Sequence, residues 1–123
     1  MRTNRKMRER YDDIVDAICV WHEEARSSKL FSMPCVKRSG AFVFGLGRGG
    51  MVFKLTDPAA HRRALALRGA HLFDPSGRGE PFRQWVVVPP AQADEWQAFA
   101  YEALGQDHGI APEALADGTQ ERG

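Results

Sequence analysis

The stretch AFVFGLGRGGMVFKL, residues 41–55, decides how the rest of the chain is interpreted. Its glycines, from Gly45 to Gly50, match the spacing G-x-G-x-x-G of dinucleotide-binding loops. That fingerprint requires a strand before the glycines and a helix after them, because the helix N-terminus holds the pyrophosphate. Here β-prone residues lie on both sides, at 41–44 and at 51–55. The pattern therefore predicts a hairpin turn whose glycines supply positive φ, and not a phosphate-binding loop.

The segments around this hairpin predict an α+β fold. The expected elements, in order, are a helix over 8–26, strands over 34–37, 41–44 and 51–55, a helix from Asp57-Pro58 to Arg68, strands over 71–73 and 83–88, and a helix over 92–105. Because helices and strands do not alternate strictly, the sheet should be largely antiparallel with helices packed against it. The order is α-β(3)-α-β(2)-α.

The length of 123 residues suits one domain. We expect a basic N-terminal arm over 1–10, the folded domain over 11–105 and a flexible polar tail over 106–123. No apolar run approaches the roughly 20 residues of a membrane helix, and no apolar stretch follows the basic start as in a secretory signal. The sequence therefore predicts a cytoplasmic protein that does not associate with membranes.

Two cysteines and three histidines are the candidate metal ligands and nucleophilic groups. Cys19 and His22 lie three residues apart on the first predicted helix, but a closed zinc site needs two further ligands. Cys35, His61 and His71 have no spacing that brings them there, and a Cys-His nucleophile pair also needs an orienting third group. We expect Cys19 and His22 to pack in or beside the core. We expect no catalytic residue, no metal ligand and no cofactor.

The loop DPSGRGEPFR, residues 74–83, is a candidate anion or ligand site. The loop contains two glycines together with Arg78 and Arg83, and Trp85 follows it. Backbone amides and guanidinium groups could therefore converge on an anion. The alternative is an ordinary loop in which the glycines satisfy turn geometry and the arginines are solvated.

Positive charge is concentrated in the first two-thirds of the chain. Sixteen of the 17 basic residues lie within 1–83, beside nine acidic residues, and the net charge of the whole chain is +1. Such asymmetry is typical of a nucleic-acid face, but ordinary surface mixing after folding produces it too. The candidate phosphate contacts are Arg2, Arg5, Lys6, Arg8, Arg10, Arg38, Arg48, Arg62 and Arg63. Phe42 and Phe44 alternate as on an RNA-binding sheet, although we expect that pair to point into the core.

Two stretches carry a resemblance to a known family: KLFSMPCVKRSGAFVFGLGRGGMVFKL at 29–55, and HLFDPSGRGEPFRQWVVVP at 71–89, which is followed by a tryptophan-bearing helix. Over about residues 10–105 the chain resembles the TfoX/Sxy N-terminal domain family and, more distantly, the YjbR-like proteins. The resemblance implies the α-β(3)-α-β(2)-α fold shared with secretion-chaperone-like dimers, and hence a homodimer. Members with a second, helical domain regulate competence for DNA uptake, and we expect this chain to be a single-domain member without it.

The family supplies no catalytic or cofactor-binding residues. The function that the resemblance implies is a non-enzymatic regulatory or accessory domain that binds a protein partner. The two alternatives are weak, sequence-independent nucleic-acid binding through the basic residues of 1–83, and small-anion or ligand binding at the 74–83 loop.

Overall fold

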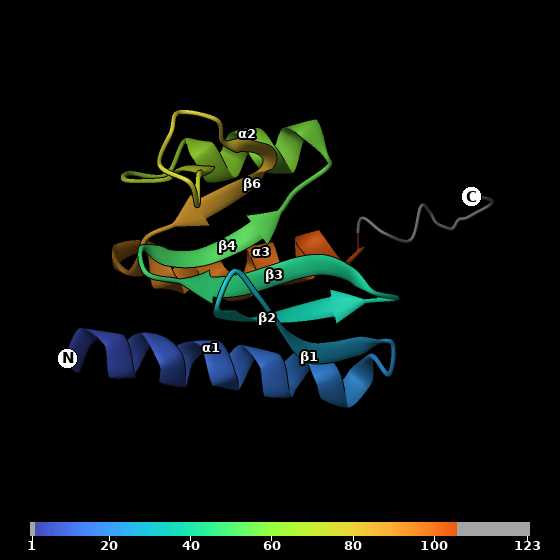
Figure 1. Ribbon diagram of the computed structural model, residues 1–123. Coiled ribbons are helices and arrows are strands. Elements are labelled where there is room, and N and C mark those ends of the chain that lie inside the picture. The colour runs from blue at the N-terminus through green and yellow to red at the C-terminus, as the bar shows by residue number, and fades with distance from the viewer. Residues whose placement is uncertain (1, 106–123) are drawn as a thin grey trace.

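The computed structural model describes residues 2–105, with side chains from Arg5 onward (Figure 1). Met1 and the expected tail at 106–123 lie outside the described residues. The elements are α1 (Arg2–Trp21), β1 (Ala25–Leu30), β2 (Met33–Arg38), β3 (Ala41–Gly47), β4 (Gly50–Lys54), α2 (Pro58–Leu65), β5 (His71–Phe73), β6 (Phe82–Val88), a 3₁₀ helix η1 (Pro90–Glu95) and α3 (Trp96–Gly105). Within residues 2–105 the strands form one antiparallel sheet of six strands in the order β1-β2-β3-β4-β6-β5.

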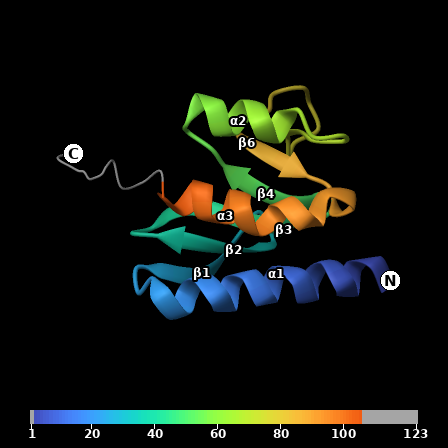
Figure 2. The same cartoon turned by 180° about the vertical axis from the view of Figure 1, so that it is seen from behind.

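The three α-helices pack on one face of this sheet, which confirms the predicted α+β class. Figure 2 shows α3 crossing the middle of that face, with α1 along the β1 side and α2 on the β6 side. The main core lies between these two layers and includes Ile18 of α1, Phe53 of β4 and Trp96 of α3. Trp96 is fully buried, and its indole N–H donates a hydrogen bond to the Val88 carbonyl oxygen at 3.0 Å.

The N-terminal part of the chain differs from the sequence expectation. The segment expected to be a basic arm forms the first half of α1, which begins at Arg2 and ends at Trp21. The reason is that Met7 is buried together with Tyr11 and Ile14, so the apolar stripe of the helix extends one turn toward the N-terminus. The end of the predicted helix is also wrong, because Ala25 begins the strand β1.

Strand β1 was not predicted and raises the observed order to α-β(4)-α-β(2)-α. Its sequence, ARSSKL, has little β propensity, but it pairs in continuous register with β2, from Ala25 opposite Arg38 to Leu30 opposite Met33. Phe31 and Ser32 close this hairpin with φ of 53° and 64°, the two positive values of a type I′ turn. Pairing with a neighbouring strand has therefore overridden local propensity.

The glycine-rich stretch is a hairpin turn, as predicted. Gly47 pairs with Gly50 across β3 and β4, and the strand β4 follows the glycines where a dinucleotide site would have a helix. Gly50 has a φ of 139°, and a Cβ at this position would clash with the Val88 carbonyl oxygen on β6. Gly45 lies inside β3, where a Cβ would come within 2.9 Å of the Pro34 carbonyl oxygen. Close backbone approach therefore explains these glycines.

Candidate binding face of the sheet

The sheet face opposite the helices, called the open face below, carries its own apolar cluster. This cluster consists of the buried residues Met33, Cys35, Phe42, Val52 and Val87, with Leu30, Phe73 and Trp85 packed against them. All eight lie on strands, so among the residues that the structure describes no helix contributes to the cluster. A sheet that is apolar on both faces but covered by helices on only one is a candidate binding surface.

A β-bulge supplies part of this cluster. The register between β2 and β3 shifts at Val43. Val36 pairs with Phe44 and the next residue, Lys37, pairs with Phe42, so Val43 has no partner on β2. Phe44 therefore points to the helix side, whereas Phe42 joins the open face. The expectation that both rings point into one core was wrong, since a bulge breaks the alternation of two residues per repeat.

Trp85 is the centre of an aromatic group on the open face. Its ring stacks on Phe42 with centroids 4.0 Å apart and planes 9° apart, and on Phe73 at 5.8 Å and 14°. Phe82 meets the same indole edge-on at 4.8 Å. Such offset-stacked and edge-to-face pairs are the favourable aromatic geometries, each worth about 0.5–1.5 kcal/mol beyond burial.

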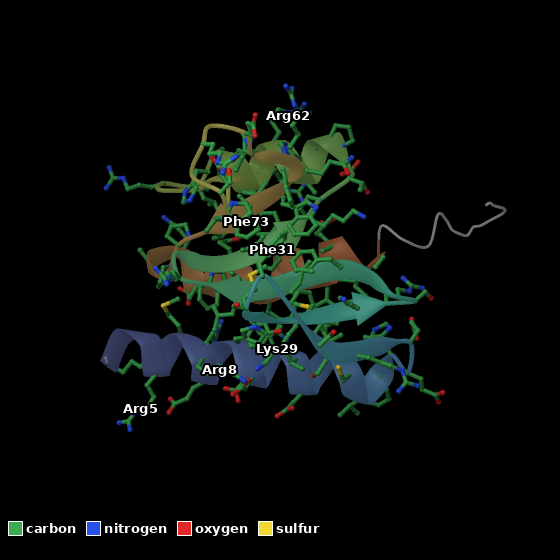
Figure 3. All side chains as sticks on the ribbon, viewed as in Figure 1. Arg5, Arg8, Lys29, Phe31, Arg62 and Phe73 are labelled. Atoms are coloured by element: carbon green, nitrogen blue, oxygen red, sulfur yellow. The ribbon has the colours of Figure 1, made fainter. Side chains whose placement is uncertain are left out.

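Phe31 adds a fifth ring to this group on the same open face, from the β1–β2 hairpin. It lies at the tip of the β1–β2 hairpin, and its ring centroid is 5.9 Å from that of Phe73, 5.7 Å from Phe82 and 6.4 Å from Trp85. Figure 3 shows Phe31 and Phe73 next to each other in front of the sheet. Phe31 is nevertheless 50% exposed. Its left-handed backbone costs about 1–2 kcal/mol for an ordinary residue, so an exposed aromatic ring is held at a strained position.

A groove of about 1030 Å³ lies on the open face beside this hairpin tip. Its lining includes apolar side chains of the strands, above all Met33, Val52 and Val87, together with the rings of Phe31 and Phe73. The charged and titratable residues of the lining are Arg8 on α1, Arg48 on the β3–β4 turn, and His71 and Asp74 on and after β5. The groove thus combines apolar and aromatic side chains with two guanidinium groups from different elements.

The two arginines differ in their surroundings. The Arg8 Nε donates to the Asp12 carboxylate at 3.0 Å, one turn along the exposed side of α1. Among the described residues no carboxylate lies within ion-pair distance of Arg48. Arg48 is therefore the more available of the two for an anionic ligand.

The 74–83 loop contains the convergence of amides that its sequence predicts, but the anion is the loop's own carboxylate. The oxygens of Asp74 accept hydrogen bonds from the Ser76 hydroxyl at 2.9 Å and from the backbone amides of Gly77 and Gly79 at 3.0 and 2.9 Å. Desolvation raises the pKa of Asp74, but the hydrogen bonds to its ionised form outweigh this effect and lower the pKa. The amides that could bind an external anion are occupied.

The three residues proposed for that loop site lie in different surroundings. Arg78 is exposed in the loop, and Arg83 is exposed on β6, where its carbonyl oxygen lies 2.7 Å from the Nε2 of His61. Trp85 packs in the aromatic group. Within residues 2–105 no hydrogen bond or ring contact joins these three side chains.

The structure spreads the predicted phosphate contacts over several elements. Figure 3 shows Arg62 on α2 at the opposite end of the molecule from Arg5 and Arg8 on α1. Several are engaged within the protein: Arg8 with Asp12, Arg10 with the Ala93 carbonyl, Arg38 with Glu24 and the Leu104 carbonyl, and Arg63 with Glu102. Lys6 is exposed on α1, and the side chain of Arg2 lies outside the described part. Of the eight whose side chains the structure describes, only Arg8 and Arg48 line the groove.

The described cysteine and histidine side chains do not cluster into a metal site. Burial raises the pKa of the Cys35 thiol, and burial together with nearby Asp16 raises that of Cys19. The Nδ1 of His22 lies 3.7 Å from the Glu24 carboxylate. Among the described residues no three His, Cys, Asp or Glu side chains are placed to hold a metal ion, and no helix is long and apolar enough to cross a bilayer.

Comparison with known proteins adds no relative. A scan of the chain against protein-family models finds no match, and searches of curated proteins and of solved structures also find none. The resemblance to the TfoX/Sxy N-terminal domain family therefore stays a prediction.

Proposed function

We propose that this protein is a cytoplasmic, non-enzymatic binding domain that engages its partner through the open face. The observation that carries this proposal is the groove of about 1030 Å³ on the open face, lined mostly by residues of strands and turns and by Met7 and Arg8 of α1. Its volume is slightly above the range of about 300–1,000 Å³ common for ligand sites. The regulatory or accessory role is the one implied by the resemblance to the TfoX family.

Two physical features support binding rather than chemistry. Phe31 is held half exposed in a left-handed conformation beside the groove, and strain of this kind concentrates where proteins bind ligands. Both thiols have a raised pKa, so they are protonated at neutral pH and are weak nucleophiles.

Photo-crosslinking tests the proposal without assuming the chemistry of the partner. A benzophenone-bearing phenylalanine replaces Phe31 in one variant and Tyr101, which is 40% exposed on α3, in the control. Irradiation in the native cytoplasm should yield adducts at position 31 that are several-fold more abundant than those at 101. Equal adduct yields at the two positions would refute the open face as the binding surface.

The predicted homodimer has a separate candidate surface at the end of α1. Val20 and Trp21 are adjacent and are 72% and 80% exposed, so a dimer contact at this end of α1 would bury their apolar surface. Sedimentation equilibrium of the wild type and of Trp21→Ser tests this part of the proposal. A dimer that dissociates in the variant supports it, and a wild type that remains monomeric at high concentration overturns it.

A further inference from the structure

We infer that the open face binds single-stranded nucleic acid, with bases stacking at Phe31 and Phe73 and phosphates contacting Arg48 and Arg8. This inference rests on the proposed function and names the ligand class of the same groove. It differs from an interaction along the whole basic part of the chain, because it assigns the contact to four residues that line one hollow.

The aromatic residues provide the stacking surface. Phe31 and Phe73 both line the groove, and their ring centroids are 5.9 Å apart with planes tilted by 57°. Half of Phe31 is open to solvent, while its contacts with Phe82 and Trp85 hold the ring in place. Every base has a π-face that can stack on such a ring, which makes the contact tolerant of sequence. A duplex keeps its base faces stacked inside, so the same surface favours an unpaired strand.

The charges of the groove suit a phosphate backbone. Arg48 of the β3–β4 turn and Arg8 of α1 both line the groove, so two different elements bring cationic groups to the aromatic and apolar lining. Asp74 is the one carboxylate in that lining, and its oxygens already accept the hydrogen bonds of its own loop. These hydrogen bonds keep Asp74 ionised, so the two arginines and one carboxylate give the lining a formal charge of +1, and Arg48 is the arginine without a carboxylate within ion-pair distance.

The same geometry is less suited to an extended peptide. Peptides that bind sheets usually add a strand at a free edge, where backbone groups are unpaired. The groove lies mainly over β2, β3, β4 and β6, each hydrogen-bonded on both sides, and it reaches the edge strand β5, which is only three residues long, at His71 and Phe73. A peptide there would find few backbone partners, whereas a nucleic-acid strand needs only cations and rings.

Fluorescence anisotropy provides the direct test. The probe is a labelled oligothymidylate of about 12 nucleotides, within the site sizes of known single-strand binders. It is titrated with the wild-type protein across a salt series, beside a duplex of the same length. We expect the single strand to bind more tightly than the duplex at every salt concentration.

Matched variants separate stacking from charge. Phe31→Ala should weaken binding roughly 5- to 100-fold, the range expected for loss of one base–aromatic stack, while Phe31→Tyr keeps the ring and should bind like the wild type. Arg48→Ala should weaken binding and reduce the log–log salt slope by about 0.7. Tyr101→Ala and Arg62→Ala remove an exposed ring and an exposed charge away from the groove, and should leave the affinity within about 2-fold. Circular dichroism confirms that each variant is folded.

Several results would overturn the inference: no binding of the single strand at low salt, equal affinity for the duplex, or the same loss in Arg62→Ala as in Arg48→Ala. The crosslinking experiment then distinguishes failure of the nucleic-acid inference from failure of the open face as the binding surface. Protein adducts at position 31 together with absent oligonucleotide binding would overturn the nucleic-acid inference and retain the open face as a binding surface. Absence of adducts as well would remove both.

Discussion

Replacing Trp96 tests whether the helix layer is packed as described. The indole is fully buried between α3 and the sheet, and its N–H donates to the Val88 carbonyl oxygen at 3.0 Å. Trp96→Ala removes the ring and leaves a cavity, for which we expect a loss of about 3–5 kcal/mol in the free energy of unfolding. Trp96→Phe keeps a ring but leaves that carbonyl without its donor, and should cost about 1–3 kcal/mol.

The assay is urea unfolding followed by far-ultraviolet circular dichroism, which does not depend on tryptophan emission. With a slope of about 2 kcal/mol per molar urea, the Trp96→Ala midpoint should fall by about 2 M. Tyr101→Ala is the control, because Tyr101 lies on the same helix, is 40% exposed and should contribute far less to stability than the buried Trp96. Equal midpoints for the two alanine variants, or a Trp96→Phe variant as stable as the wild type, would refute the packing argument.

Three further predictions follow from backbone geometry and hydrogen bonding. Gly50→Ala should lower stability by about 2 kcal/mol or more, because the new Cβ clashes with the Val88 carbonyl oxygen at a φ of 139°; a melting temperature like that of the wild type would contradict this close approach. Ser32→Gly should raise stability by up to about 1 kcal/mol, since the φ of 64° is strained for serine, and an unchanged unfolding midpoint would show that the turn beside Phe31 is not strained. The pKa of Asp74 is lowered in the folded protein, so its hydrogen bonds stabilise the loop at neutral pH and are lost as the pH falls through that lowered value; nuclear magnetic resonance titration should show the loop amides shifting together at a pH below the ordinary pKa of an aspartate, and a transition at or above that ordinary pKa would contradict the assignment.

The sequence was sufficient for the class of the fold and for the central hairpin, because these depend on local patterns. The β-prone residues on both sides of the glycines predict two strands, and Asp57 before Pro58 predicts the start of α2. The structure agrees: the Asp57 carboxylate accepts a hydrogen bond from the Ala60 amide as an N-cap. Strand β1 could not be predicted in this way, since ARSSKL becomes a strand only through its register with β2.

The candidate site was harder to predict because its residues come from distant parts of the chain. Arg48 was recognised as a basic residue, but nothing local indicates that it lines a groove together with Arg8 and Phe31. The aromatic residues at 73, 82 and 85 were a usable signal, since they cluster in a segment otherwise rich in turn formers. In the 74–83 loop the sequence pattern favours the arginines as binding groups. The residue whose hydrogen bonds organise the loop is instead Asp74.

Two local irregularities argue that the aromatic group is more than residual packing. The bulge at Val43 turns Phe42 away from the helix side, and the strained turn places Phe31 over the opposite strands. Each departs from regular geometry at some cost in stability, and both bring a ring into the group around Trp85. Departures from local regularity that converge on one exposed surface are expected where function, and not folding alone, has shaped the sequence. This convergence is a second physical reason, beside the groove, for proposing the open face as a binding surface.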